Sequence, residues 1–174
     1  MKRNLLKSAL VLSALAVLLG AAGCDEDPAK KKIIDESEVV EKTSETSLDT
    51  PANVTIMVTG RTMAVTWSAV NDAEGYEIFT TSENCGSGNK IINTKDNTAT
   101  RHDGTGSYIK DDKSNGAVEI KSNTSIEITL MPKAGDTTKP MATSVTAKVK
   151  ALGGLNLNDS SYSEVETCNI SDGM

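Results

Sequence analysis

Apolar and polar residues alternate one by one in short stretches throughout the sequence beyond Pro51. A period of two places the apolar side chains of each stretch on one side of an extended chain, which is the pattern of a half-buried β-strand. Turn-forming sequences such as TGR, NDAEG and KSNT separate the stretches. The alternating apolar positions are Val54, Ile56 and Val58, then Met63, Val65 and Trp67, Tyr76 and Ile78, Val118 and Ile120, Ile126, Ile128 and Leu130, and Val145, Ala147, Val149 and Ala151.

With a last candidate strand in SYSEVETCNI, these stretches predict about seven short strands and no long helix. That pattern favours an all-β fold, a sandwich of two packed sheets. The chain of 174 residues is long enough for one domain with a real core. Because aromatic residues make up only 3% of the chain, this core must depend on Val, Ile, Leu and Met. Trp67 and Tyr76 lie in the alternating pattern, so we expect both in the core.

The sequence VTGRTMAVTWSAVNDAEGYEIF, residues 58–79, resembles the first half of a fibronectin type III domain, in which strand B ends in Trp and strand C opens with Tyr. LMPKAG resembles the Leu-x-Pro-x corner of the family, VTAKVKALG its strand F and SYSEVETC its strand G. The resemblance covers residues 51–171 and implies an immunoglobulin-like β-sandwich. Three features depart from the family: Val145 replaces the Tyr that opens strand F, DTTKPMAT is inserted before that strand, and the segment 80–117 is longer than the family's span allows.

Residues 80–117 are expected to form a long inserted loop, because Gly, Asn, Asp and Ser are frequent there. KIIN is the one stretch within it that favours a brief additional strand. Tyr108 and Ile109 form a bulky apolar pair in this segment and are the expected ligand contacts, since an aromatic side chain on a loop can stack on a sugar or enter a pocket of a partner. Alternatively, Tyr108 only covers the edge of the sandwich.

The N-terminal residues 1–23 have the layout of an export signal. Lys2, Arg3 and Lys7 precede an apolar run from Ala9 to Gly20, which is too short to span a bilayer as a helix. The sequence AAGC that follows resembles a bacterial lipobox. The resemblance implies that residues 1–23 are removed and that Cys24 carries the lipid anchor. The alternative is ordinary signal-peptide cleavage, which would leave Cys24 free or disulfide-bonded.

Residues 24–50 comprise this cysteine and an acidic, charge-rich stretch that is expected to be a disordered tether. A short amphipathic helix around Ile33 and Val40 is the alternative. Without Lys2, Arg3 and Lys7 the chain has 15 basic residues against 24 acidic ones, a net charge of −9. Because such a chain is repelled by polyanions, no nucleic-acid partner is expected. We expect an extracytoplasmic location, on the periplasmic face or surface of the outer membrane, with the lipid as the membrane contact.

Cys85 and Cys168 remain as an even pair if Cys24 is lipidated. Persistent free thiols are rare outside the cytoplasm. In the fold that the resemblance implies, strands C and G flank strand F and end at the same end of the sheet. A Cys85–Cys168 disulfide is therefore expected.

Several polar residues of the 80–117 segment are of types that occur in catalytic or metal-binding sites. His102, Asp103 and Ser107 contain the residue types of a hydrolase triad, but closeness in sequence does not create triad geometry, and no Gly-x-Ser-x-Gly elbow is present. Asp103, Asp111 and Asp112 could offer oxygen ligands to calcium, although their spacing does not match an EF-hand. We therefore expect a solvated polar loop, with no catalytic residue, metal or cofactor.

These observations predict a lipid-anchored cell-envelope protein that binds or adheres to a protein or glycan partner without catalysis. A structural spacer or assembly subunit of the envelope is the first alternative. A small hydrolase that uses the 80–117 segment is the second.

Overall fold

The computed structural model describes residues 46–82 and 88–171. They belong to a compact unit that spans Val40–Met174. The proposed signal peptide 1–23, the lipidation site Cys24, the greater part of the proposed tether and Cys85 lie outside the described residues. No helix of the described part is long and apolar enough to cross a membrane.

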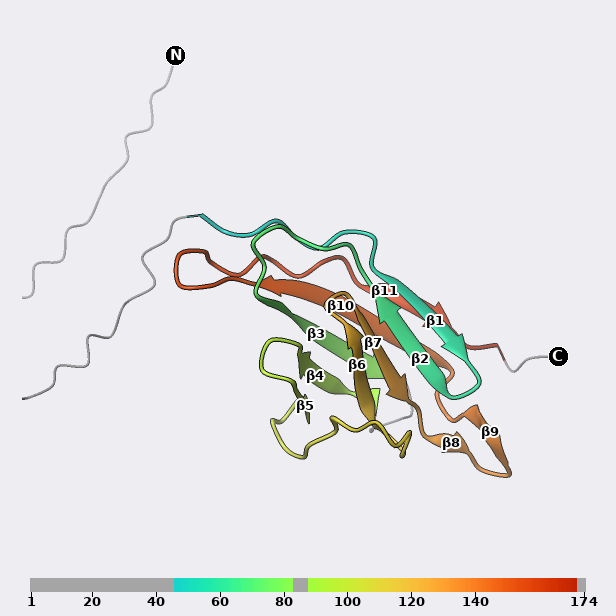
Figure 1. The fold of residues 1–174 in the computed structure, drawn as a ribbon. Helices are drawn as coiled ribbons and strands as arrows, with labels where there is room; N and C mark the ends of the chain where they lie inside the picture. Colours follow the sequence, from blue (N-terminus) through green and yellow to red (C-terminus); the bar gives the residue numbers. More distant parts are fainter. Residues whose placement is uncertain (1–45, 83–87, 172–174) are drawn as a thin grey trace, which may run out of the picture. The chain divides into compact units, whose positions relative to one another are not determined.

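The described residues are organised as strands without an α-helix (Figure 1). The strands are β1 (Thr55–Thr59), β2 (Thr62–Thr66), β3 (Gly75–Ser82), β4 (Lys90–Asn93), β5 (Thr98–Arg101), β6 (Val118–Ser122), β7 (Ser125–Thr129), β8 (Pro132–Lys133), β9 (Asp136–Pro140), β10 (Ser144–Leu152) and β11 (Glu166–Asn169). The expected all-β class is thus confirmed.

The strands form two main sheets in which all neighbours are antiparallel. One has four strands in the order β1-β2-β7-β6, and the other has five in the order β11-β10-β3-β4-β5. The pair β8-β9 forms a separate hairpin that projects from one end of the sheets (Figure 1). Both main sheets contribute side chains to one hydrophobic cluster. This arrangement is consistent with a β-sandwich.

The period-two pattern correctly identified the side chains that fill this cluster. The residues predicted to face inward from β2, β3, β7 and β10 are all buried, and Val118 of β6 is buried as well. Trp67 is 5% exposed and Tyr76 is 4% exposed, and their rings meet edge to face with centroids 5.3 Å apart. Val54, Ile56 and Val58 are only partly buried, because β1 is an edge strand.

The N-terminal side of the domain includes residues that were expected in the tether. Leu48 belongs to the hydrophobic cluster, and its backbone N–H donates to the carbonyl of Asn158 at 3.0 Å. Ser47 forms a parallel bridge with the same residue. The packed domain therefore begins before Pro51.

Residues 80–117, which we expected to form a long loop, contain more strand structure than predicted. β3 continues through Ser82, and KIIN forms β4 as predicted, but β5 was not predicted. Together with β8 and β9, this brings the described part to eleven strands instead of about seven. The reason is that Ile92 and Ala99 reach the core from β4 and β5, whereas the turns between these short strands give the segment its polar composition.

Candidate functional site

The outer face of the five-stranded sheet carries the most distinctive group of side chains. Its position depends on serines that attach residues 160–163 to the edge of β10. The Ser163 hydroxyl accepts from the N–H of Val149 at 3.0 Å, and the Ser160 hydroxyl accepts from the N–H of Ala151 at 2.9 Å. The backbone N–H groups of the same serines donate to the carbonyls of Val149 and Ala151. These paired contacts hold the intervening Tyr162 against β10.

Lys148 lies between two aromatic rings on this face. Strand register pairs Lys148 of β10 with Phe79 of β3. The Lys148 Nζ atom is 4.9 Å from the centre of the Phe79 ring and 4.3 Å from the centre of the Tyr162 ring. Both distances are in the range of cation–π attraction. In the described part of the chain, no carboxylate forms an ion pair with Lys148.

His102 extends the group at the other side of Phe79. The two rings stack with centroids 4.0 Å apart and an interplanar angle of 19°. The Nε2 atom of His102 also lies 2.9 Å from the carbonyl oxygen of Thr80, which fixes the ring against β3. We call Phe79, His102, Lys148 and Tyr162 the aromatic–lysine row.

A network of paired charges borders the aromatic–lysine row. Lys150 contacts Glu77 at 3.0 Å and Asp159 at 3.8 Å, and the Tyr162 hydroxyl donates to the carboxylate of Glu77. Burial acts to raise the pKa of Glu77, but the hydrogen bonds from Tyr162 and Lys150 and the charge of Lys150 outweigh it, so the pKa is lowered. Burial together with the Glu77 carboxylate raises the pKa of Tyr162. Lys150 is thus neutralised locally, in contrast to Lys148.

The surroundings of the row form an open surface rather than a deep cavity. Tyr162 also lines a broad depression of about 470 Å³ between residues 50–54 and 162–166. Glu164 and Glu166 are among the residues that line this depression. The row therefore combines packed aromatic rings with one ammonium that has no ion pair in the described residues, and such an ammonium can form a charge-assisted hydrogen bond with an acidic group.

Sequence reasoning did not identify this row. Phe79 and Lys148 point outward from β3 and β10. The alternating apolar pattern that predicted these strands comes from the inward residues, and it says nothing about which outward side chains lie together. Their juxtaposition depends on the β3–β10 register, and that of Tyr162 on the serine contacts. The available signal was the group of serines at and just before the start of SYSEVETCNI, the last predicted strand. β11 begins only at Glu166, so these serines precede the strand, and two of them contact β10 through their hydroxyls.

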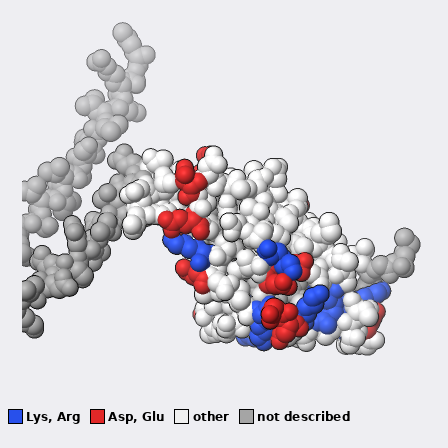
Figure 2. All heavy atoms as spheres, viewed as in Figure 1, with Lys and Arg blue, Asp and Glu red and all other residues white. Residues whose placement is uncertain are grey.

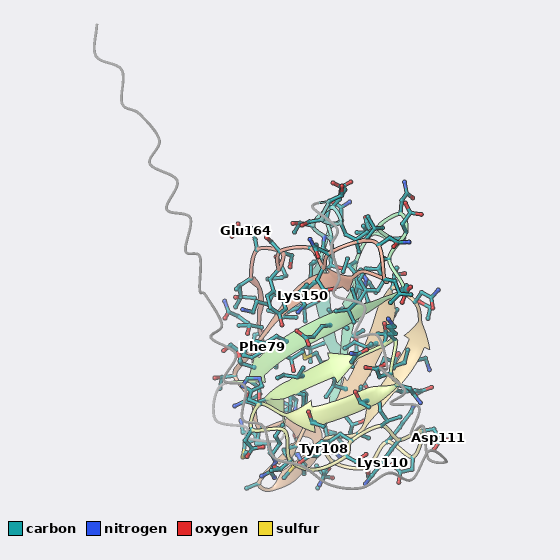
Figure 3. All side chains as sticks on the ribbon, turned by 90° about the vertical axis from the view of Figure 1, so that its left-hand side faces the viewer. Phe79, Tyr108, Lys110, Asp111, Lys150 and Glu164 are labelled. Atoms are coloured by element: carbon teal, nitrogen blue, oxygen red, sulfur yellow. The ribbon has the colours of Figure 1, made fainter. Side chains whose placement is uncertain are left out.

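Tyr108, one of the two predicted ligand contacts, lies at the β5 edge of the five-stranded sheet, away from Phe79 and Lys150 (Figure 3). The other, Ile109, forms a bridge with Val118 of β6. The N–H of Tyr108 donates to the carbonyl of Ala99 in β5, and its carbonyl accepts from Val118 in β6. Its ring lies over the buried Lys90, with Nζ 4.1 Å from the ring centre, and its hydroxyl accepts from Arg101. This segment connects the edges of the two sheets.

Ile109 contributes to a shallow depression of about 310 Å³ at the same edge. Val118 and Ile120 form the rest of its apolar lining, and Lys110 and Asp111 are among its polar residues. The structure does not bring Tyr108 and Ile109 together with the aromatic–lysine row.

The acidic residues of the 102–112 segment accept hydrogen bonds from their own turns. Asp103 accepts from the backbone N–H and the hydroxyl of Thr105, and these bonds lower its pKa. Asp112 accepts from the N–H of Ser114, which lowers its pKa as well. In the described residues, no hydrogen bond joins His102, Asp103 and Ser107, and no cluster of three His, Cys, Asp or Glu residues could hold a metal ion.

Acidic and basic side chains are mixed over the face of the domain seen in Figure 2. On the four-stranded sheet, for example, Lys121 contacts Glu119 at 2.7 Å and Glu127 at 3.9 Å. That view shows no large patch of a single sign that would attract a polyion. Comparison with known protein families and with curated proteins finds no match to this chain.

Proposed function

We propose that this protein is a lipid-anchored, non-catalytic binding protein of the cell envelope that holds a protein or glycan partner. In this proposal Cys24 attaches the chain to the membrane, and residues 25–45 link the anchor to the domain. The order of signal, lipobox-like sequence and acidic stretch in the sequence supports the attachment.

We further propose that the domain is a fibronectin type III or immunoglobulin-like sandwich. The strand order β1-β2-β7-β6 corresponds to strands A, B, E and D of such domains, and β11-β10-β3-β4-β5 corresponds to G, F, C, C′ and C″. In this assignment the unpredicted strands β4 and β5 extend the sheet that carries the aromatic–lysine row.

The aromatic–lysine row is the observation that supports a binding role most directly. Its aromatic rings come from β3, from the turn after β5 and from the segment before β11, and serine contacts and register hold them in fixed positions. Preformed aromatic surfaces of this kind favour binding because few side-chain rotamers are lost when a partner docks.

A capture experiment with the full chain tests the role. The lipidated protein in detergent, its Phe79→Ala/Tyr162→Ala variant and a Met57→Ala control would each be incubated with solubilised envelope material. Met57 is 69% exposed and belongs to β1 in the other sheet, so its loss controls for a general change in surface hydrophobicity.

We expect the wild type and the Met57 variant to retain the same partner, and the double variant to lose it while keeping its β-type circular dichroism. Equal capture by all three proteins would contradict a binding role for the row. Homo-oligomers as the only captured species would instead favour the spacer or assembly role.

A further inference from the structure

We propose that two copies of this chain associate through β1, with the two β1 strands antiparallel and the two Met57 side chains next to each other at a two-fold axis. This pairing joins two four-stranded sheets into one continuous sheet. β1 belongs to the sheet that does not carry the aromatic–lysine row, so the inference goes beyond the proposed binding function and is tested separately.

The edge strands of the two main sheets differ in how they are protected. The edge of β5 is covered because the carbonyl of Ala99 accepts from the N–H of Tyr108, and the edge of β6 because the N–H of Val118 donates to the carbonyl of Tyr108. β11 begins with the exposed Glu166. Covering segments and charges are the usual means of blocking pairing at sheet edges. Within the described residues, β1 has neither, since its sequence TIMVT is uncharged.

The turn between β1 and β2 decides which backbone groups of β1 are free. Only two residues separate Thr59 from Thr62, so these two threonines form the hydrogen-bonded pair that closes the hairpin. Because hydrogen-bonded and non-hydrogen-bonded pairs alternate along an antiparallel ladder, Met57 also directs its N–H and C=O to β2. Ile56 and Val58 direct theirs to the open edge, and no described backbone group bonds to them there.

The neighbouring strand of the other sheet leaves this edge accessible. β11 lies next to β1 (Figure 1), but Ile56 and Val58, whose side chains face the core, are only partly buried. A depression of about 410 Å³ adjoins Val58, and the depression that Tyr162 lines reaches Val54 at the other end of the strand. A second strand can therefore reach the free backbone groups of β1 and cover the exposed parts of these side chains.

A two-fold pairing gives the free groups matching partners. When Ile56 of one copy lies opposite Val58 of the other, the outward N–H and C=O groups of both strands form two hydrogen-bonded pairs. Met57 then faces Met57 of the second copy in the non-hydrogen-bonded pair between them, where Cα atoms lie about 4.5 Å apart.

The outer side of this pairing is self-complementary, which favours a second copy over a foreign strand. Met57 is 69% exposed, and Thr55 and Thr59 on either side of it are exposed as well. In the two-fold pairing the Met57 side chains cover each other, and each Thr55 lies opposite a Thr59. Neither β1 nor the adjacent β2, TMAVT, contains a charge. The net charge of −6 of the whole chain therefore places no like charges against each other at the axis.

Disulfide cross-linking of the full chain in detergent tests the register. Met57→Cys places the new thiols where Cα atoms are about 4.5 Å apart, which a disulfide can span, so an oxidant should link most of the protein into dimers. Thr59→Cys is the matched control, because in this register its two copies are about 14 Å apart and should form no dimer beyond the wild-type level. The wild type measures any linking through the native cysteines.

Charge variants test the same contact without a new cysteine. Wild-type copies that carry two different affinity tags should co-purify. Met57→Lys on both copies should abolish co-purification because it sets two ammonium groups side by side, and mixing Met57→Lys with Met57→Glu should restore it. Leu155→Lys adds the same charge to another exposed apolar residue and should co-purify like the wild type. Met57→Ala keeps the backbone bonds and adds no charge, so it should still pair. Circular dichroism would establish that each variant is folded.

Three results would overturn the inference: wild-type copies that do not co-purify, equal cross-linking of Met57→Cys and Thr59→Cys, or Met57→Lys copies that pair as the wild type does. Phe79→Ala/Tyr162→Ala should pair like the wild type, and loss of pairing in this variant would contradict the assignment to β1. A failure of partner capture by the aromatic–lysine row would leave the self-association through β1 unaffected.

Discussion

Ser82 at the end of β3 and Cys168 near the end of β11 are both paired with Val145, from opposite sides of β10. Because β3 and β11 are each antiparallel to β10, they run in the same direction and end at the same end of the sheet. The strand arrangement on which the disulfide prediction depended is therefore present, although Cys85 lies outside the described residues.

We predict that Cys85 and Cys168 form a disulfide in the exported protein. Thiol labelling of the denatured, unreduced protein should modify neither cysteine, and labelling after reduction should modify both. Because the bond would close a long loop, its reduction should lower the free energy of unfolding by at most about 4–5 kcal/mol. Quantitative labelling of Cys168 before reduction would contradict the prediction.

The hydroxyl of Tyr76 should contribute measurably to stability. It accepts a hydrogen bond of 2.8 Å from the backbone N–H of Val70, next to the buried ring of Trp67. Tyr76→Phe leaves that N–H without its acceptor, so we expect a loss of about 1–2 kcal/mol in urea unfolding. The matched control is Tyr108→Phe, which removes a hydrogen bond to the exposed Arg101 and should cost less.

Glu77 should make stability depend on pH in the acidic range. Its pKa is lowered in the folded state, so its contribution is present above its ordinary value of 4.5 and is lost as the pH falls through the folded-state value. We expect Glu77→Gln to reduce the difference in urea midpoint between pH 6 and pH 3. Tyr162→Phe should reduce it in part, since it removes one of the hydrogen bonds that lower this pKa. A wild-type pH dependence in Glu77→Gln would argue against this role.

Cys24 should determine membrane attachment. Intact mass of the mature wild-type protein should show a chain that begins at Cys24 with acyl groups attached. Cys24→Ala should move the protein from the membrane pellet to the soluble fraction, because two or three acyl chains anchor stably and their loss leaves only the charged stretch that follows. Cys168→Ala is the control and should still pellet; pelleting of Cys24→Ala would exclude the lipid anchor.

The local pattern was sufficient for the inward faces of the strands. Met63, Val65 and Trp67 of the second predicted strand are all buried, and SVTAKVKAL forms β10 over its whole length. The KSNT turn joins β6 to β7 as predicted. Burial requires only that alternate residues be apolar, and this requirement can be read along the chain.

The edge strands and the beginning of the domain could not be predicted from the alternating apolar pattern. β5 has the sequence TATR, in which only Ala99 is apolar, and it becomes a strand because it pairs with β4 and covers the core with that one side chain. Leu48 joins the core from a polar stretch because residues 46–48 pair with Asn158. In both cases the partner strand or segment decides the structure.

The all-β class, the inward face of most strands and the candidate export and anchor signals could be predicted from the amino-acid order, because each depends on neighbouring residues. The arrangement of side chains on the surface of the domain could not. The tertiary structure brought Phe79, His102, Lys148 and Tyr162 together through strand register and serine contacts, and it separated them from Tyr108 and Ile109. The physical reason is that side chains on an outer face are not selected by burial, so their grouping is set by pairing between segments far apart in the chain.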